Sequence, residues 1–282
     1  MSPAYAIAAL SSLLFGGGDF LGGLAARRAP APLVTGFSCL AALLVLGLAM
    51  LVVHGAPTPA DLAWGAAAGV CSAAGATLMY RALALGPMSL ASPVFCLIGL
   101  MVPVLFGFAS GERPSPVAWA GVAMSALAIP LLAMTGEGPG HLPRAHVRRT
   151  LVASIAAGLV IGWFLVVVSR IGGGAGLLPL GLARVVAIAI LGGWQLARGQ
   201  SLVPAAAART PALAAGALDS AANVAYLIAV HMAPLMLVSA LVSLAPAVTV
   251  LVARFGLGER WTVAQGAGLV VALAAGVCIA VG

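Results

Sequence analysis

Long apolar stretches follow one another along almost the whole chain, and short gaps between them hold most of the charged residues, prolines and glycine clusters. A helix that crosses the hydrocarbon core of a bilayer needs about 20 mostly apolar residues. Ten stretches reach this length, and they predict an all-α protein with ten membrane-spanning helices. The predicted helices are 3–24, 33–53, 61–84, 87–109, 115–135, 149–169, 175–196, 210–231, 234–255 and 261–281.

The composition agrees with a membrane protein and excludes several other classes. Of the 282 residues, 63% are hydrophobic and 7% are charged, whereas a soluble domain has about 45–50% apolar and about 25% charged residues. So few charged side chains leave too little polar surface for a soluble enzyme or a nucleic-acid-binding protein. The chain contains no lysine, and therefore no phosphate-binding Gly-x-x-x-x-Gly-Lys motif that would indicate an ATP-driven pump.

The two halves of the sequence resemble each other. Several identical residues recur 147 positions apart: Ala82 and Ala229, Pro87 and Pro234, Ser92 and Ser239, Glu112 and Glu259, Gly121 and Gly268. We therefore expect a first repeat at 1–137 with helices 1–5, a linker at 138–148, and a second repeat at 149–282 with helices 6–10. An odd number of helices in each repeat places the repeats in opposite orientations, as in the inverted repeats of secondary transporters.

The repeated motifs resemble those of the drug/metabolite transporter superfamily, in particular its ten-helix EamA type. The residues that carry the resemblance are the Tyr-x-Ala-Leu-x-x-Gly-Pro segment at 80–87 and the Gly-Glu-Arg segments at 111–113 and 258–260. The segment from Phe15 to Gly23 is similar to the start of some family members, with Phe15 where tryptophan is common. The resemblance implies two inverted five-helix repeats around a central cavity, and export or exchange of small metabolites without ATP.

Three ionisable residues lie well inside the predicted spans, away from their ends: Asp19, Arg184 and Asp219. Such residues are costly in a bilayer and indicate function by default. One interpretation is a buried ion pair between Arg184 and one aspartate that fixes helix packing. The other is a protonatable carboxylate that couples proton entry to substrate exit, with Arg184 as counter-ion or substrate anchor. Under the second interpretation, Asp219→Asn should abolish proton-driven transport and leave the melting temperature largely unchanged.

Asp219, Asn223 and Tyr226 share one face of the eighth predicted helix, because they are spaced i, i+4 and i+7. A polar stripe on an apolar span faces protein or water rather than lipid. The stripe therefore predicts a cavity wall, with hydrogen bonding between helices as the alternative.

Further residues are candidates for a cavity wall. They are Phe15, Tyr80, Ser92, Pro93, Trp163, Phe164 and Ser239. Trp163 and Phe164 lie deep in helix 6, where an aromatic ring either stacks on a substrate or simply packs. Pro93, Pro103 and Pro246 are expected to interrupt helices 4 and 9, which frees backbone carbonyls for a substrate or a hinge, or produces only a packing kink.

Glu112 and Glu259 lie in predicted loops, each followed by an arginine. A salt bridge or cap at a helix end explains both residues, and a role in gating is the alternative. The four cysteines lie in separate apolar stretches without close spacing and predict neither a metal site nor a disulfide. We expect no cofactor.

These observations predict a secondary active transporter in the plasma membrane of a bacterium, a multi-pass monomer or weak homodimer without a nucleic-acid partner. Its substrate would be a small organic solute, either amino-acid-like, an amine or aromatic, and coupling to protons is one option. A second hypothesis is an intramembrane aspartyl protease that uses Asp19, in Gly16-x-Gly18-Asp19, together with Asp219. A third is a channel or scramblase.

The arginines give a membrane orientation that conflicts with the one the resemblance implies. Connections after odd-numbered helices hold ten arginines: Arg27, Arg28, Arg81, Arg144, Arg148, Arg149, Arg198, Arg209, Arg254 and Arg260. Connections after even-numbered helices hold only Arg113 and Arg170. The positive-inside rule then predicts both termini outside, whereas the resemblance implies both in the cytoplasm. A reporter fused to the C-terminus distinguishes the two orientations.

Overall fold

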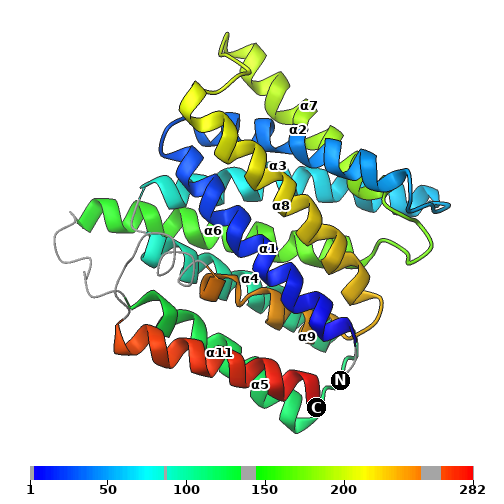
Figure 1. The fold of residues 1–282 in the computed structure, drawn as a ribbon, viewed down its shortest axis with the longest axis vertical. Coiled ribbons are helices and arrows are strands. Elements are labelled where there is room, and N and C mark those ends of the chain that lie inside the picture. The colour runs from blue at the N-terminus through cyan, green and yellow to red at the C-terminus, as the bar shows by residue number, and fades with distance from the viewer. Residues whose placement is uncertain (1–2, 86–87, 135–143, 249–261, 282) are drawn as a thin grey trace.

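The computed structural model describes residues 3–85, 88–134, 144–248 and 262–281, which fold into helices and contain no β-strand. Figure 1 shows the helices as long rods lying side by side, with the two chain ends close together. The helices are α1 (Pro3–Ala26), α2 (Ala31–Met50), α3 (Pro59–Leu85), α4 (Met88–Ala109), α5 (Pro116–Ala133), α6 (Arg144–Ser169), α7 (Leu178–Ala197), α8 (Ala206–Val230), α9 (Leu235–Val242) and α11 (Val263–Val281).

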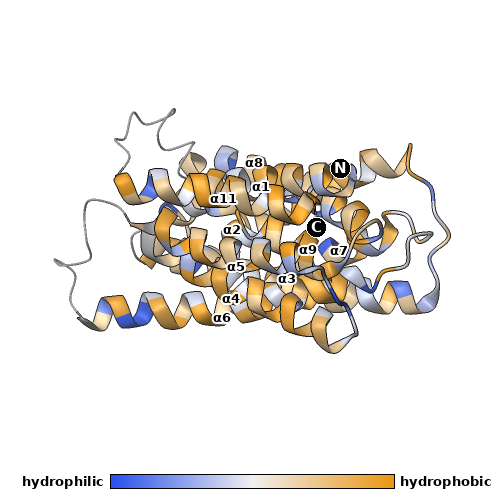
Figure 2. Cartoon of the chain, turned by 90° about the horizontal axis from the view of Figure 1, so that it is seen from below, coloured by the Kyte–Doolittle hydropathy of each residue, from blue (hydrophilic) through white to orange (hydrophobic). Residues whose placement is uncertain are grey.

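Eight of these helices are long and apolar enough to cross a membrane: α1, α2, α3, α4, α6, α7, α8 and α11. Two further apolar helical segments, Pro116–Leu132 and Leu235–Val248, are shorter than a full span. Figure 2 shows apolar residues along the helices and hydrophilic residues mainly at helix ends and connections. The sequence therefore predicted the apolar segments correctly, and within the described residues eight of the ten predicted spans reach full length.

The helix ends follow local sequence signals with small differences from the predicted bounds. Helix α5 begins after Ser115, whose hydroxyl accepts a hydrogen bond from the Ala118 amide at 3.1 Å, and Pro116 occupies its first turn. Helix α6 begins at Arg144, five residues before the predicted start at 149. The last residues of the predicted 138–148 linker are therefore the first turn of α6.

The prolines do not act as predicted in α4. That helix is continuous from Met88 to Ala109 although Pro93 and Pro103 lie inside it. The prediction of an interruption there was wrong, because neighbouring groups in a membrane bundle satisfy the backbone carbonyls that a proline frees. In the second half, α9 ends at Val242, and a turn at 243–244 separates it from the next helical residues, which include Pro246.

Helices from the first half of the chain pack mainly against helices from the second half. Helix α1 contacts α8 while α3 contacts α6, and α2 contacts α8 while α3 contacts α7. Helix α4 packs on α6, α1 packs on α9, and α5 lies along α11 at one edge of the molecule (Figure 1). The halves interdigitate, so neither forms a separate core.

Glycines 147 residues apart occupy corresponding helix crossings. A Cβ on Gly121 of α5 would lie 2.9 Å from the Ala275 carbonyl oxygen of α11. A Cβ on Gly268 of α11 would lie 2.8 Å from the Leu132 amide nitrogen of α5. Both distances are too short for a real side chain, so glycine at these positions allows the two backbones to touch.

Polar contacts close the end of the bundle at which α3 and α9 begin. The Asp61 carboxylate accepts hydrogen bonds from the Thr58 amide at 2.8 Å, the Thr58 hydroxyl at 2.7 Å, and the Gly172 amide at 2.7 Å. His231 Nε2 donates to the Ile171 carbonyl at 2.7 Å. The α2–α3, α6–α7 and α8–α9 connections are thereby tied together.

Glu112, in the α4–α5 connection, caps a helix of the other half. Its carboxylate oxygens accept hydrogen bonds from the Leu235 amide at 2.9 Å and the Met236 amide at 3.0 Å, at the start of α9. A carboxylate at a helix N-terminus satisfies unpaired N–H groups and interacts favourably with the helix dipole. The cap interpretation of Glu112 agrees with this geometry, although the capped helix is far away in sequence.

We expect Glu112→Ala to destabilise the protein by about 1–2 kcal/mol, because two amides at the start of α9 lose their acceptors. The melting temperature in detergent measures this loss. Glu112→Gln is the matched control and should lose less, since its amide oxygen still accepts a hydrogen bond. Equal melting of Glu112→Ala and the parent would contradict the capping role.

Candidate functional site

A small cavity lies in the centre of the bundle, with a volume of about 90 Å³. Its walls come from α1, α3, α4, α6, α8 and the region where α9 ends. The lining residues are Phe15, Asp19, Cys71, Ser72, Ala76, Met79, Phe95, Cys96, Gly99, Ile161, Phe164, Leu165, Asp219, Val242, Ser243 and Ala245. Ligand pockets usually measure about 300–1,000 Å³, so this cavity is smaller than a usual ligand pocket.

The glycine run of α1 brings Asp19 to this cavity. A Cβ on Gly16 would lie 2.6 Å from the Ala245 carbonyl oxygen, beyond the end of α9. A Cβ on Gly18 would lie 3.3 Å from the Ala215 carbonyl oxygen and 3.6 Å from the Asp219 amide nitrogen of α8. Because glycines face both neighbours, α1 fits closely between them, and Asp19 and Asp219 line the same cavity.

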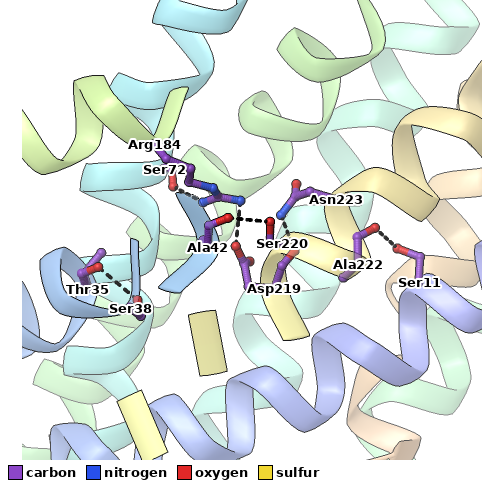
Figure 3. A network of polar contacts seen from close by, with 10 residues as sticks. All are labelled: Ser11, Thr35, Ser38, Ala42, Ser72, Arg184, Asp219, Ser220, Ala222 and Asn223. Atoms are coloured by element: carbon purple, nitrogen blue, oxygen red, sulfur yellow. Dashed lines mark hydrogen bonds and ion pairs between the residues drawn. The ribbon is translucent and has the colours of Figure 1, made fainter. Parts of the chain in front are cut away.

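Asp219 is ion-paired with Arg184 of α7. One guanidinium nitrogen, Nη2, lies 2.7 Å from Asp219 Oδ2, and the other, Nη1, donates to the Ser72 hydroxyl at 3.0 Å. Figure 3 shows Arg184 reaching between Ser72 and Asp219. The Arg184 side chain is 4% exposed and the Asp219 side chain is 33% exposed. Arg184 therefore stands behind the cavity wall, while the carboxylate faces the cavity.

The two partners of Arg184 occupy equivalent positions of the two halves. Ser72 and Asp219 are 147 residues apart, which is the spacing of the sequence repeat. The same spacing relates two further pairs of lining residues, Phe95 with Val242 and Cys96 with Ser243. These first-half residues were not among the predicted site residues. Subtracting the repeat spacing from Asp219 points to Ser72, so the sequence already held this signal.

Asp19 differs from Asp219 because no positive group among the described residues is paired with it. Within the described part of the chain, its carboxylate forms no hydrogen bond and no ion pair. The neighbouring lining residues include the aromatic side chains of Phe15, Phe95 and Phe164. The cavity thus holds one carboxylate that is neutralised by an arginine and one that is not.

Asn223 and Tyr226 share a helix face with Asp219 but are not among the cavity-lining residues. The Asn223 side chain is fully buried, and its Nδ2 donates to the Asp219 carbonyl at 2.7 Å. The Tyr226 hydroxyl donates to the Leu165 carbonyl at 3.0 Å and lies 3.4 Å from the Ser239 hydroxyl. These contacts correspond to the alternative interpretation, hydrogen bonding within and between helices.

Some of the aromatic candidates line the cavity and others do not. Phe164 is 8% exposed and lines the cavity, whereas the preceding Trp163 is 51% exposed and touches the Phe106 ring edge to face, with 6.1 Å between ring centroids. Tyr80 is buried where its ring packs against Gly22 of α1. Ser92 and Pro93 are buried in α4 and do not line the cavity.

A second hollow, of about 340 Å³, lies at the end of the bundle where α9 begins. It includes Glu112, Phe106 and Arg170, and the Arg170 guanidinium lies 4.8 Å from the centre of the Phe106 ring. None of its lining residues belongs to the central cavity. Across the residues that the structure describes, no group of three or more histidine, cysteine or acidic side chains could hold a metal ion.

Comparison with known protein families agrees with the predicted resemblance. The model of the EamA-like transporter family matches residues 2–134. The match covers a little less than half of the chain, so this part of the chain is similar to the EamA-like transporter family. Several apolar helices are long enough to span a bilayer, as in a multi-pass membrane protein.

Comparison with solved structures adds the fold of the whole chain. A crystal structure of another protein superposes on this chain with a TM-score of 0.77 and 17% sequence identity. The superposition covers 100% of this chain and 98% of the other. At this identity the likeness shows the fold alone. No curated protein matches the chain by sequence.

Proposed function

We propose that this EamA-like protein is a secondary active transporter that moves a small organic solute by alternating access through the central cavity. The main support for the proposal is that both halves of the chain contribute residues to the cavity walls. Residues at equivalent positions of the two halves line the same cavity, such as Phe95 and Val242. A binding site between two related halves is the arrangement of secondary transporters.

Inverted repeats are part of this proposal, and the helix contacts support them. In the repeat, α1, α2 and α3 of the first half correspond to α6, α7 and α8 of the second half. Exchanging them turns the α1–α8 contact into α6–α3 and the α2–α8 contact into α7–α3, and both contacts are present. Two halves with equivalent contacts have two arrangements of similar packing, one open to each side of the membrane. Transport then needs no large change in the packed area of either half.

The closed end of the bundle is the gate in this proposal. Asp61 ties the start of α3 to Gly172 in the α6–α7 connection. The residue 147 positions after Asp61 is Ala208, which has no carboxylate. An unequal gate of this kind favours one of the two arrangements in the absence of substrate.

Proton coupling through a cavity carboxylate completes the proposal. Asp219 is held by Arg184 in this conformation, so a proton or a substrate at Asp219 replaces the guanidinium during the cycle. Asp19 is already free of such a partner among the described residues. Export across the plasma membrane of a bacterium is the direction and location that we propose on the family resemblance.

Filling the cavity tests the proposal. Ala76 lines the cavity from α3, whereas Val70 of the same helix is 53% exposed on the outer surface. Ala76→Phe should abolish counterflow in proteoliposomes assayed with a panel of labelled amino acids, amines and aromatic metabolites. Val70→Phe should transport like the parent, because its ring faces lipid. Normal counterflow in a folded Ala76→Phe protein would place the solute path elsewhere.

The same liposomes separate the competing hypotheses. Accumulation of solute against its gradient on a pH jump is incompatible with a channel or scramblase. An aspartyl protease requires two carboxylates that share a proton. The protease hypothesis is not favoured here, because the partner of the Asp219 carboxylate is the Arg184 guanidinium and not the Asp19 carboxyl group.

A further inference from the structure

We propose that the central cavity selects a monovalent organic cation with an apolar or aromatic body, and that Asp19 supplies its counter-charge. This inference rests on the proposed transport function, because it names the class of solute that the same cavity carries. The sequence is compatible with amino-acid-like solutes, amines and aromatic solutes, and this inference selects the amines.

The first argument for a cationic solute comes from the charges around the cavity. No lining residue is basic, and two are acidic, Asp19 and Asp219. Arg184 lies 2.7 Å from Asp219 and neutralises it. With both carboxylates ionised, the cavity and its supporting arginine have a net charge of one negative unit, located at Asp19. One positive charge on the solute balances it.

The second argument comes from the position of Arg184, which disfavours a solute that has a carboxylate. The substrate carboxylate of an amino acid or an organic acid needs a cationic or strongly donating partner when it leaves water. Arg184 is buried, stands behind Asp219, and already donates to Asp219 and Ser72. A carboxylate in this cavity would instead face Asp19 and Asp219. Anions and zwitterions are therefore disfavoured relative to cations.

The remaining lining residues describe the body of the solute. Phe15, Phe95 and Phe164 come from three different helices, α1, α4 and α6, and surround the cavity together with aliphatic side chains such as Ile161 and Leu165. Aromatic faces attract organic cations, and the attraction increases when water is excluded. Few polar groups are present to bind hydroxyl or amide substituents, so the solute is apolar apart from its charge.

The size of the cavity requires that binding is accompanied by movement. A volume of about 90 Å³ is well below the roughly 300–1,000 Å³ of a usual ligand pocket, so an aromatic amine needs a larger cavity than this one. Val242, Ser243 and Ala245 form the wall at the point where α9 ends. Interrupted helices at a transporter midplane are sites of both binding and motion, so this wall is the one that moves outward.

A set of probes with similar shape and different charge tests the inference. Phenethylamine is a cation at neutral pH, phenethyl alcohol is neutral, phenylalanine is a zwitterion and phenylacetate is an anion. With the purified full-length protein in detergent, we expect phenethylamine alone to raise the melting temperature in a dose-dependent way. Asp19→Asn should weaken phenethylamine binding roughly tenfold or more, as expected for loss of a charged hydrogen-bond partner.

Two variants serve as controls. Asp19→Glu keeps the charge and should keep the preference for the amine, which guards against a loss caused only by misfolding. Glu112→Gln makes the same carboxylate-to-amide change outside the central cavity and should bind phenethylamine like the parent.

The outcomes separate this inference from the transport proposal. Equal or tighter binding of phenylalanine or phenylacetate overturns the cation inference, as does unchanged amine binding in Asp19→Asn. Counterflow of other solutes without binding of phenethylamine leaves transport intact and overturns the cation site. Amine binding that depends on Asp19, without counterflow of any solute, supports the site and contradicts transport.

Discussion

Asp219→Asn should lower the stability of the protein by about 3 kcal/mol, because it removes the charge that neutralises a buried arginine. Arg184 is 4% exposed, and after the substitution a neutral amide stands where the carboxylate balanced its positive charge. The ion pair therefore changes the expectation from sequence that Asp219→Asn melts like the parent. Thermal unfolding in detergent measures the effect.

Two further variants separate the ion pair from its surroundings. Ser72→Ala removes a neutral partner of the same guanidinium and should cost about 1 kcal/mol. Replacing both Arg184 and Asp219 with leucine should recover most of the loss, since apolar residues of similar volume often replace a buried pair without cost. If Asp219→Asn and Ser72→Ala melt at the same temperature, the charge pair contributes little to stability.

Gly216→Ala should be similarly destabilising for a steric reason. A Cβ on Gly216 of α8 would overlap the carbonyl group of Ser38 in α2, and backbone cannot move aside as a flexible side chain does. The α2–α8 contact must open, and overpacking of this kind costs about 1–3 kcal/mol or more. We expect a lower melting temperature and a smaller folded fraction in detergent.

Gly193→Ala is the matched control for this variant. Gly193 lies in α7, is exposed, and has no atom within 4 Å of the position of a Cβ. Alanine there should leave stability unchanged or raise it by up to about 1 kcal/mol through its higher helix propensity. A Gly216→Ala protein as stable as Gly193→Ala would show that α2 and α8 do not need their close approach.

The apolar stretches predicted the helices well because the bilayer imposes their length. The sequence also indicated, through Pro246, that the ninth predicted span is interrupted, and the structure confirms this with a turn at 243–244. The stretch 234–255 is apolar from its start, and Arg254 is its first charged residue. The turn after Val242 lies just before Pro246, which has no amide to donate to the Val242 carbonyl. The Ser12 hydroxyl of α1 donates to that carbonyl at 3.3 Å instead, a contact that a single stretch of sequence does not contain.

The site was predicted in part, for geometric reasons. Phe15, Asp19, Phe164 and Asp219 line the cavity as the sequence suggested. Asn223 shares the face of Asp219, but it lies more than a turn further along α8, beyond the cavity. A helical face extends over the whole helix, whereas the cavity touches only part of it. Spacing along one helix therefore shows which side of the helix a residue lies on, but not whether it lies at the level of the cavity.

The interdigitation of the two halves has a consequence for how the protein is made. The Ser11 hydroxyl of α1 donates to the Ala222 carbonyl of α8, 211 residues away. At a synthesis rate of about 5–20 residues per second, the first helix waits roughly 10–40 s for this partner. During that time the newly inserted helices carry Asp19 in the bilayer without their native neighbours. We therefore expect the first half to remain without its native packing until the second half is inserted.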